Sequence, residues 1–245
     1  MIKKALEYIV GLSNPTVQEI GGETYSDKEL YRINHTPYAK PIEMNTLSAL
    51  IDYIRAGVEN FPEEFSENMI VHVQSPTRVC MYSALDRERK REYLVEVKAN
   101  IPNFAFDQFQ EHEAFCIGVQ SKFQDDLETD KALLLKFAGT VEAGSVAEYG
   151  DDGVSQKATV KTGIASKGEA IIPSPVKLRP FRTFAEVYQP TCSFIFRMKE
   201  DKYKGGIQCA LFEADGGAWK ISAMESIKFY LTSALEDFPQ FLVIS

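Results

Sequence analysis

Apolar residues recur at helical spacing in five segments of the chain. Within residues 1–12 they favour one side of a helix, and over residues 47–58 they repeat every three or four positions until Pro62. Asn45 or Thr46 is suited to cap this second helix. Three further helices are predicted, over residues 106–123, 128–138 and 222–235.

Alternating and short apolar runs predict strands. A strand over residues 69–73 precedes a hairpin, in which residues 78–85 and 93–99 flank the charged turn DRERKRE. Further strands are expected over residues 140–149, 154–165, 187–198 and 207–213, and residues 241–244 form an apolar strand or docked tail. The segment IIPSPVKLRPF has three prolines, so it belongs at a sheet edge or in a crossover.

The order of these elements predicts an α+β fold. Helices dominate the first half and strands the second, without regular βαβ alternation, which favours a mainly antiparallel sheet flanked by helices. Residues 1–41 are expected to form an N-terminal helix and an irregular arm rich in Pro, Gly, Asn and Thr. Residues 42–245 then form a single α+β domain, because no flexible linker divides them.

Composition excludes several classes of protein. Of the 245 residues 44% are apolar and 25% are charged, which is typical of soluble globular proteins. No apolar stretch is long enough to span a bilayer, so no membrane contact is expected. The four cysteines and three histidines show no short metal-ligand spacing, and no P-loop or dinucleotide fingerprint occurs. We therefore expect a cytoplasmic protein with reduced thiols and with no metal or cofactor.

Positive charge is concentrated in one segment. Between Ser155 and Gly205 the chain carries ten basic and four acidic side chains, although the formal net charge of the protein is −8. Proteins that bind nucleic acid generally have a broad basic surface. A local positive field in an acidic protein suits a small anionic ligand better than a long polyanion. The alternative is that these charges simply lie on solvated strand faces and loops.

The same segment contains the best candidates for a ligand site. Lys157 and Lys161 share one strand face by the period of two, and two arginines bracket Phe181. Arginine presents a planar fork to phosphate, and an aromatic ring offers a stacking face to a base. The predicted ligand-binding residues are Lys157, Lys161, Lys177, Arg179, Phe181 and Arg182. The alternative is that the phenylalanines of this region are core residues and the arginines are surface residues.

Two fragments of catalytic motifs also occur. Glu96-Val97-Lys98, with Asp86 upstream, resembles half of a metal-dependent nuclease site, but the hairpin separates Asp86 from Glu96. His112 has no second histidine four residues away, since that position holds Cys116. Neither fragment completes a catalytic set, so the sequence favours a protein without enzymatic activity.

The succession of segments LSALIDYI, FAFDQF, GTVEAGSVAEY, GVSQKATVKTG, IIPSPVKLRPF, SFIFRM and CALFEA, with the strand pair around Val71 and Val79, resembles the YfdQ-like family of phage and prophage proteins. The resemblance covers about residues 40–240. It implies a phage- or prophage-encoded protein that works in the bacterial host cytoplasm, in a family whose members form a domain of unknown function.

Three functions fit that setting. The first is a non-enzymatic binding protein, an anti-defence sponge that sequesters a nucleotide-derived immune signal. The second is an accessory protein of phage DNA replication or recombination, acting through single-stranded DNA or protein contacts. The third is a metal-dependent phosphodiesterase that uses Glu96 and Lys98. Because symmetric subunits commonly share pockets, a homo-oligomer is expected.

Overall fold

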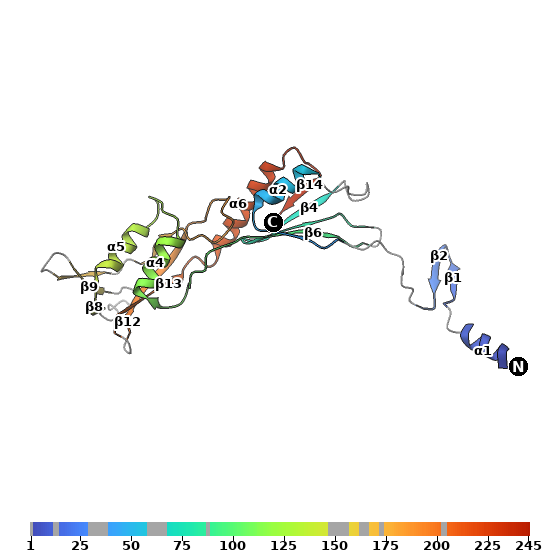
Figure 1. Ribbon diagram of the computed structural model, residues 1–245, viewed down its shortest axis with the longest axis horizontal. Helices are drawn as coiled ribbons and strands as arrows, with labels where there is room; N and C mark the ends of the chain where they lie inside the picture. Colours follow the sequence, from blue (N-terminus) through green and yellow to red (C-terminus); the bar gives the residue numbers. More distant parts are fainter. Residues whose placement is uncertain are drawn as a thin grey trace. The chain divides into compact units, whose positions relative to one another are not determined.

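A computed structural model describes residues 2–11, 15–28, 39–57, 68–86, 89–146, 157–161, 167–171, 174–201 and 205–245 (Figure 1). The chain divides into two compact units, Met1–Tyr38 and Ala39–Ser245. Helices combine with mostly antiparallel or mixed sheets, which confirms the predicted α+β class. Among the described residues, no helix combines the length and the apolar character needed to cross a membrane.

The first unit contains a helix and a hairpin. Helix α1 (Ile2–Gly11) agrees with the helical pattern, whereas strands β1 (Val17–Ile20) and β2 (Glu23–Ser26) pair where an irregular arm was predicted. The turn between the strands consists of Gly21 and Gly22, whose φ angles are 66° and 86°. Glycine adopts this left-handed conformation without steric cost, and a two-residue hairpin turn requires it. The predicted irregular arm thus contains a regular hairpin.

The second unit contains a five-stranded sheet with the order β14-β4-β5-β6-β3. Its three central strands are antiparallel, and the strands at its two edges run parallel to their neighbours. The strands are β3 (Ile42–Met44), β4 (Met69–Ser75), β5 (Arg78–Tyr82), β6 (Tyr93–Lys98) and β14 (Phe241–Ile244). The predicted hairpin is thus confirmed as β5 and β6, and the C-terminal segment is a strand.

Two helices cover one face of this sheet. Helices α2 (Leu47–Ala56) and α6 (Ala218–Ala234) lie on the same side of β6 (Figure 1), and their apolar residues share a core cluster with Val71 and Val97. Thr46 caps α2, as expected, since its side chain accepts a hydrogen bond of 3.2 Å from the Ala49 N–H. The helix ends at Ala56, earlier than predicted, and the next residue, Gly57, has a left-handed φ of 56°.

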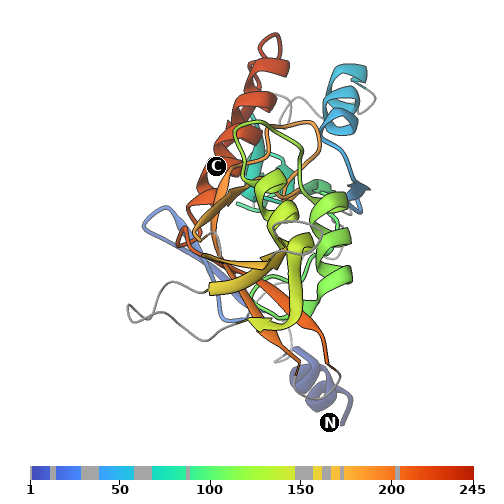
Figure 2. The same ribbon diagram turned by 90° about the vertical axis from the view of Figure 1, so that its left-hand side faces the viewer.

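A four-stranded antiparallel sheet with the order β11-β12-β13-β7 forms the other part of this unit. Its strands are β7 (Gln110–Glu111), β11 (Val176–Leu178), β12 (Cys192–Glu200) and β13 (Ile207–Glu213). Helices α4 (His112–Lys122) and α5 (Lys131–Thr140) contact each other (Figure 2), and both supply residues to a second core cluster with Phe194 and Phe196. The proline-rich segment supplies β11 at the edge, as predicted.

Three further strands form a small antiparallel sheet with the order β10-β9-β8. They are β8 (Val141–Val146), β9 (Lys157–Lys161) and β10 (Lys167–Ile171). Strands β8 and β9 fall within the strands predicted over residues 140–149 and 154–165, whose other residues lie mostly outside the described structure, and β10 was not predicted. The turn GDDG at residues 150–153, which was expected between two of these strands, lies outside the described residues.

The helix that was predicted to begin near residue 106 begins at His112 instead. Asp107 adopts a left-handed φ of 58°, and its N–H donates to the Leu211 carbonyl at 2.9 Å. Its carboxylate accepts from the Glu213 N–H at 3.0 Å, and the residues that follow pair with β13. Hydrogen bonds to a distant strand therefore replace the first two turns of the predicted helix.

The strand that was predicted from residue 187 starts at Cys192. Before it, the Gln189 side chain accepts hydrogen bonds from the Arg182 and Thr183 N–H groups and donates to the Phe184 carbonyl. These buried side-chain bonds satisfy the backbone of a compact loop without a partner strand. The loop positions Arg182, which is central to the site described next.

Candidate functional site

The predicted cationic residues do not all lie together. Lys177 is on edge strand β11 with its side chain exposed, and its N–H donates to an Asp130 carboxylate oxygen at 2.7 Å. Lys157 and Lys161 are the first and last residues of β9, but the placement of their side chains lies outside the described structure. A phosphate-binding role for these three lysines stays a prediction.

Arg179 is buried, with only 2% of its surface exposed. Its Nη1 donates to Asp126 Oδ2, its Nη2 lies 3.5 Å from Glu128 Oε2, and both Nε and Nη2 donate to Thr191 Oγ1. The guanidinium also stacks on Tyr188, 4.3 Å from the ring centroid. Groups of the protein thus already occupy its donors, which favours a structural role for Arg179 over the predicted contact with a ligand.

Arg182 is also buried, but its surroundings are mainly aromatic. Its guanidinium carbon lies 3.9 Å from the Phe106 ring centroid, 4.7 Å from that of Trp219 and 5.1 Å from that of Phe194. Its Nη2 lies 2.8 Å from Glu213 Oε1. The contact with Glu213 is an ion pair rather than an aligned hydrogen bond, because neither terminal nitrogen of Arg182 has a hydrogen-bond partner among the described residues.

Trp219, next to Arg182, also has a donor without an acceptor in the described residues. Its Nε1 is shielded from solvent and has no hydrogen-bond partner in the described part of the chain. A buried donor without an acceptor costs about 1–3 kcal/mol, and native proteins contain few of them. Two adjacent side chains with unpaired donors therefore indicate a place where an acceptor from outside the chain would be stabilised.

A cavity of about 330 Å³ adjoins these two side chains. We call it the Arg182 pocket, and its walls include Phe104, Phe106, Lys122, Phe181, Arg182, Glu213 and Trp219. Its volume falls at the lower end of the range typical of small-molecule sites. The structure thus brings together Phe181 and Arg182 of the predicted set, together with aromatic and charged residues that the sequence pattern did not single out.

Several backbone contacts hold the pocket in shape. The Phe181 N–H donates to the Lys122 carbonyl at 3.0 Å, and Phe123 forms an isolated antiparallel bridge with Pro180. Lys122 directs its ammonium to the Asn103 carbonyl. A Cβ atom on Gly118 would lie 2.9 Å from the Phe104 ring, so the absence of a side chain there lets α4 approach this wall closely.

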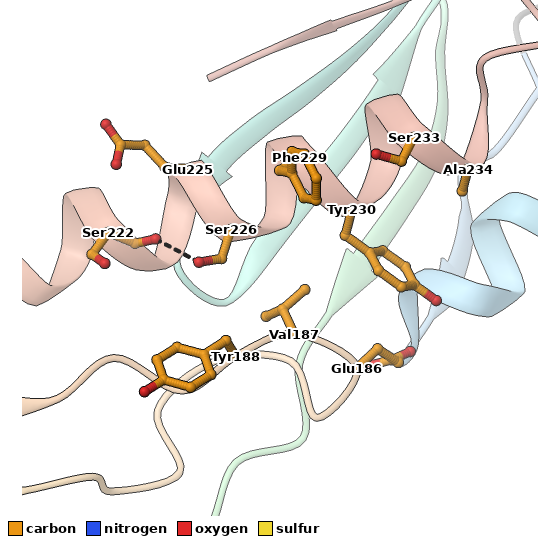
Figure 3. Close-up of a pocket in the computed structure, with 10 residues that line it drawn as sticks. All are labelled: Glu186, Val187, Tyr188, Ser222, Glu225, Ser226, Phe229, Tyr230, Ser233 and Ala234. Carbon is orange, nitrogen blue, oxygen red and sulfur yellow. Dashed lines mark hydrogen bonds between the residues drawn. The ribbon is translucent and has the colours of Figure 1, made fainter. Parts of the chain in front are cut away.

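A second hollow lies along α6 (Figure 3). This groove of about 630 Å³ runs between the helix and the segment Glu186–Tyr188, with Phe229 and Tyr230 on the helix side. Phe229 is 75% exposed. The Glu186 carboxylate is already engaged, because it accepts hydrogen bonds from the Leu47 N–H and the Ser48 hydroxyl. Of the predicted ligand residues whose side chains are described, none lines the groove.

The E-x-K fragment forms an ion-pair cluster on β5 and β6. Glu96 is 7% exposed, with Oε1 2.7 Å from Arg78 Nε and 3.1 Å from Lys98 Nζ. Desolvation opposes ionisation of Glu96, but the hydrogen bond from Lys98 and the charge of Arg78 outweigh it and lower the pKa of the carboxyl group. The Asp86 carboxylate accepts from the Lys90 N–H in the turn. No group of three metal-ligating side chains occurs within the described ranges.

Neither the His112–Cys116 pair nor the thiols of Cys192 and Cys209 supply an activated nucleophile. His112 Nε2 lies 2.9 Å from the Ala138 carbonyl and 3.7 Å from Cys116 Sγ. All four thiols are free, and burial raises the pKa of both Cys192 and Cys209 to about 12 and also raises that of Cys116. These three thiols are therefore protonated and unreactive near neutral pH.

Comparison with known proteins found no relative of this chain. The resemblance to the YfdQ-like family is therefore still a prediction from the order of the sequence elements. No family model, curated protein or solved structure matches the chain.

Proposed function

We propose that this protein is a non-enzymatic binding protein that captures a small, anionic, nucleotide-like ligand in the Arg182 pocket. The observation that carries the proposal is a pair of buried donors beside a cavity, on Arg182 and Trp219, for which the described residues supply no hydrogen-bond acceptor. A ligand acceptor that reached these donors would remove the cost of leaving them unpaired.

The walls of the pocket also suit a nucleotide. Rings of Phe104, Phe106, Phe181 and Trp219 border it, and aromatic side chains stack on bases of any sequence. Lys122 adds a cation to the same wall. A planar ring can therefore lie among the aromatic residues while an anionic group of the ligand remains near the lysine.

Binding without turnover fits the charged residues that border the pocket. Glu213 is committed to its ion pair with Arg182, and Lys122 donates to a backbone carbonyl. A general base needs a free proton-accepting group within hydrogen-bond reach of its substrate. Of the described lining residues, only Glu213 carries a carboxylate, and its withdrawal would leave Arg182 as an unpaired buried charge.

The biological role that we propose follows from the resemblance to phage and prophage proteins. In a bacterial host cytoplasm, a binding protein of this kind would act as an anti-defence sponge that sequesters a nucleotide-derived immune signal. Such a sponge would need neither metal nor cofactor, and we expect it to be a homo-oligomer. Its capacity would be set by the number of its pockets.

Native mass spectrometry of protein purified from cells that make nucleotide signals tests this function. We expect a small molecule that stays bound in the native state and is released intact on denaturation. Replacing Phe181 with alanine should reduce retention, because the variant loses a ring that borders the pocket. The matched control is Phe229→Ala, which removes an exposed ring from the α6 groove and should retain the molecule.

Two results would contradict the proposal. If protein from such cells is ligand-free, or if Phe181→Ala retains as much ligand as the control, the Arg182 pocket is not a capture site. Binding of single-stranded oligonucleotides that weakens steeply with salt would instead support the role in phage DNA replication or recombination.

A further inference from the structure

The charge balance within the Arg182 pocket limits what can enter it. The ion pair of Arg182 with Glu213 neutralises the guanidinium, whose side chain is 6% exposed. A phosphate placed against Arg182 would lose its hydration and would also approach the Glu213 carboxylate. The buried part of a ligand is therefore better stabilised if it is uncharged.

The unpaired donors define the hydrogen-bonding groups that this uncharged part must carry. Arg182 Nη1 and Trp219 Nε1 have no acceptor among the described residues, and the Arg182 guanidinium lies 4.7 Å from the Trp219 ring centroid. The two side chains are neighbours, and the ligand that we infer would place one of its edges against both donors. Both nitrogens are shielded from solvent, so that edge reaches them only when side chains of the wall shift.

Aromatic rings form part of the walls and can contact a flat ring of a ligand. Phe104 and Phe106 have centroids 4.8 Å apart, and Phe106 in turn stacks on the guanidinium of Arg182. Aromatic and guanidinium planes of this kind pack against planar ligands. The ring would present two neighbouring acceptor atoms to Arg182 and Trp219.

We infer that the Arg182 pocket binds an oxopurine base, with the phosphate of the nucleotide outside it near Lys122. Guanine presents its O6 and N7 as adjacent acceptors on one edge, whereas adenine replaces O6 with an amino donor. Two donors in the wall would therefore favour guanine and oppose adenine. This inference rests on the proposed function and changes the expected role of Arg182 from phosphate contact to base contact.

Tryptophan fluorescence of the full chain provides a direct assay, because Trp219 is its single tryptophan. The probes are guanosine, GMP, AMP and inorganic phosphate. We expect guanosine and GMP to change the emission in a saturable way. The affinity for AMP should be at least about tenfold lower, which is the discrimination expected for one good pair of base contacts. Inorganic phosphate alone should neither change the emission nor compete with guanosine.

A conservative variant of Trp219 tests the Nε1 donor independently of the aromatic ring. Trp219→Phe keeps an aromatic wall but removes the Nε1 donor, so its preference for GMP over AMP in calorimetry should fall by about tenfold. Lys122→Met should weaken the binding of GMP more than that of guanosine, since guanosine has no phosphate. Phe229→Ala, on the same helix but in the groove, should behave as the unmodified protein.

The outcomes distinguish this inference from the proposed function. Equal affinity for GMP and AMP, or phosphate binding as tight as that of GMP, would overturn the base assignment and leave ligand capture intact. Unchanged selectivity in Trp219→Phe would also overturn it. If none of the four probes binds, the base assignment fails, and the mass-spectrometric experiment then decides separately whether the pocket captures any ligand.

Discussion

Arg179 and Arg182 are three residues apart in the sequence, yet their guanidinium groups are stabilised in different ways. Carboxylate and hydroxyl oxygens surround Arg179, whereas aromatic rings and one carboxylate surround Arg182. Both arginines are buried, although one interpretation of the sequence placed them on the surface. This difference favours a structural role for Arg179 and supports the proposed contact of Arg182 with a ligand.

Replacing Arg179 with alanine should destabilise the protein. The change leaves Asp126 and Thr191 without their buried partner, and breaking a buried ion pair costs about 3–5 kcal/mol. Because Asp126 is partly exposed, we expect the lower end of this range in urea unfolding. Lys177→Ala removes an exposed cation nearby and should change stability by less than about 0.5 kcal/mol. Equal unfolding midpoints for the two variants would contradict the structural role of Arg179.

Glu96 should make the stability of the protein depend on acid pH. The pKa of Glu96 in the folded state is lower than the ordinary value of 4.5. Its contribution to the free energy of unfolding is therefore complete above pH 4.5 and is lost as the pH falls through the folded-state pKa. Glu96→Gln should therefore be less stable near neutral pH, and the difference from the unmodified protein should shrink on acidification. Urea unfolding over this pH range measures it. A difference that stays constant would show that the cluster with Arg78 and Lys98 does not favour the carboxylate.

Among the helices, α2 has an N-terminus that is bound from two directions. Thr46 accepts from the Ala49 N–H, and Glu186, from a segment far along the chain, accepts from the Leu47 and Ser48 N–H groups. These contacts satisfy three of the free N–H groups that begin any helix and place a carboxylate at its positive end. The cap therefore also ties the loop beside the Arg182 pocket to this helix.

Thr46→Ala should lower the free energy of unfolding by about 1 kcal/mol, the usual cost of losing a side-chain cap. Thr46→Ser keeps an oxygen in the same position and should restore most of the stability. Chemical denaturation of the two variants gives the comparison. If serine and alanine destabilise equally, the hydroxyl does not cap the helix.

Elements with a strong local pattern could be predicted, and those shaped by distant contacts could not. The apolar spacing of α2 and the Thr46 cap were visible in the sequence, as were β5, β6 and the edge position of β11. The start of α4 was not, because Asp107 bonds to residues of β13 that lie more than 100 positions away. The glycine turn at residues 21–22 did carry a local signal for the β1–β2 hairpin, which the prediction of an irregular arm overlooked.

The candidate site could be predicted only in part, for the same reason. Phe181 and Arg182 are neighbours in a basic segment, so their side chains could be proposed together. Glu213 and Trp219 join them through packing of β13 and α6, and no local pattern links these residues to Arg182. The groups around each guanidinium, rather than its burial, distinguish the two arginines, and the spacing of charged residues contains no information on those groups.

Both apolar clusters belong to the unit Ala39–Ser245, and in the described part of the chain their buried members come from Leu47 onward, with Met44 packed against one of them. We therefore expect the chain that begins at Ala39 to fold and to melt at the same temperature as the full protein. Thermal unfolding followed by circular dichroism tests this, with the full chain as reference. A large fall in the melting temperature of the shorter chain would show that residues 1–38 contribute to the stability of this unit.

Helix α6 belongs to both clusters, since Trp219 near its start packs into one, and Ile227, Leu231 and the following Leu235 pack into the other. Neither cluster can unfold without exposing apolar residues of helix α6. The two are thus mechanically joined, and calorimetry should record a single melting event rather than two. A molecule held beside Trp219 would then slow amide hydrogen exchange at the distant end of the helix, around Leu231.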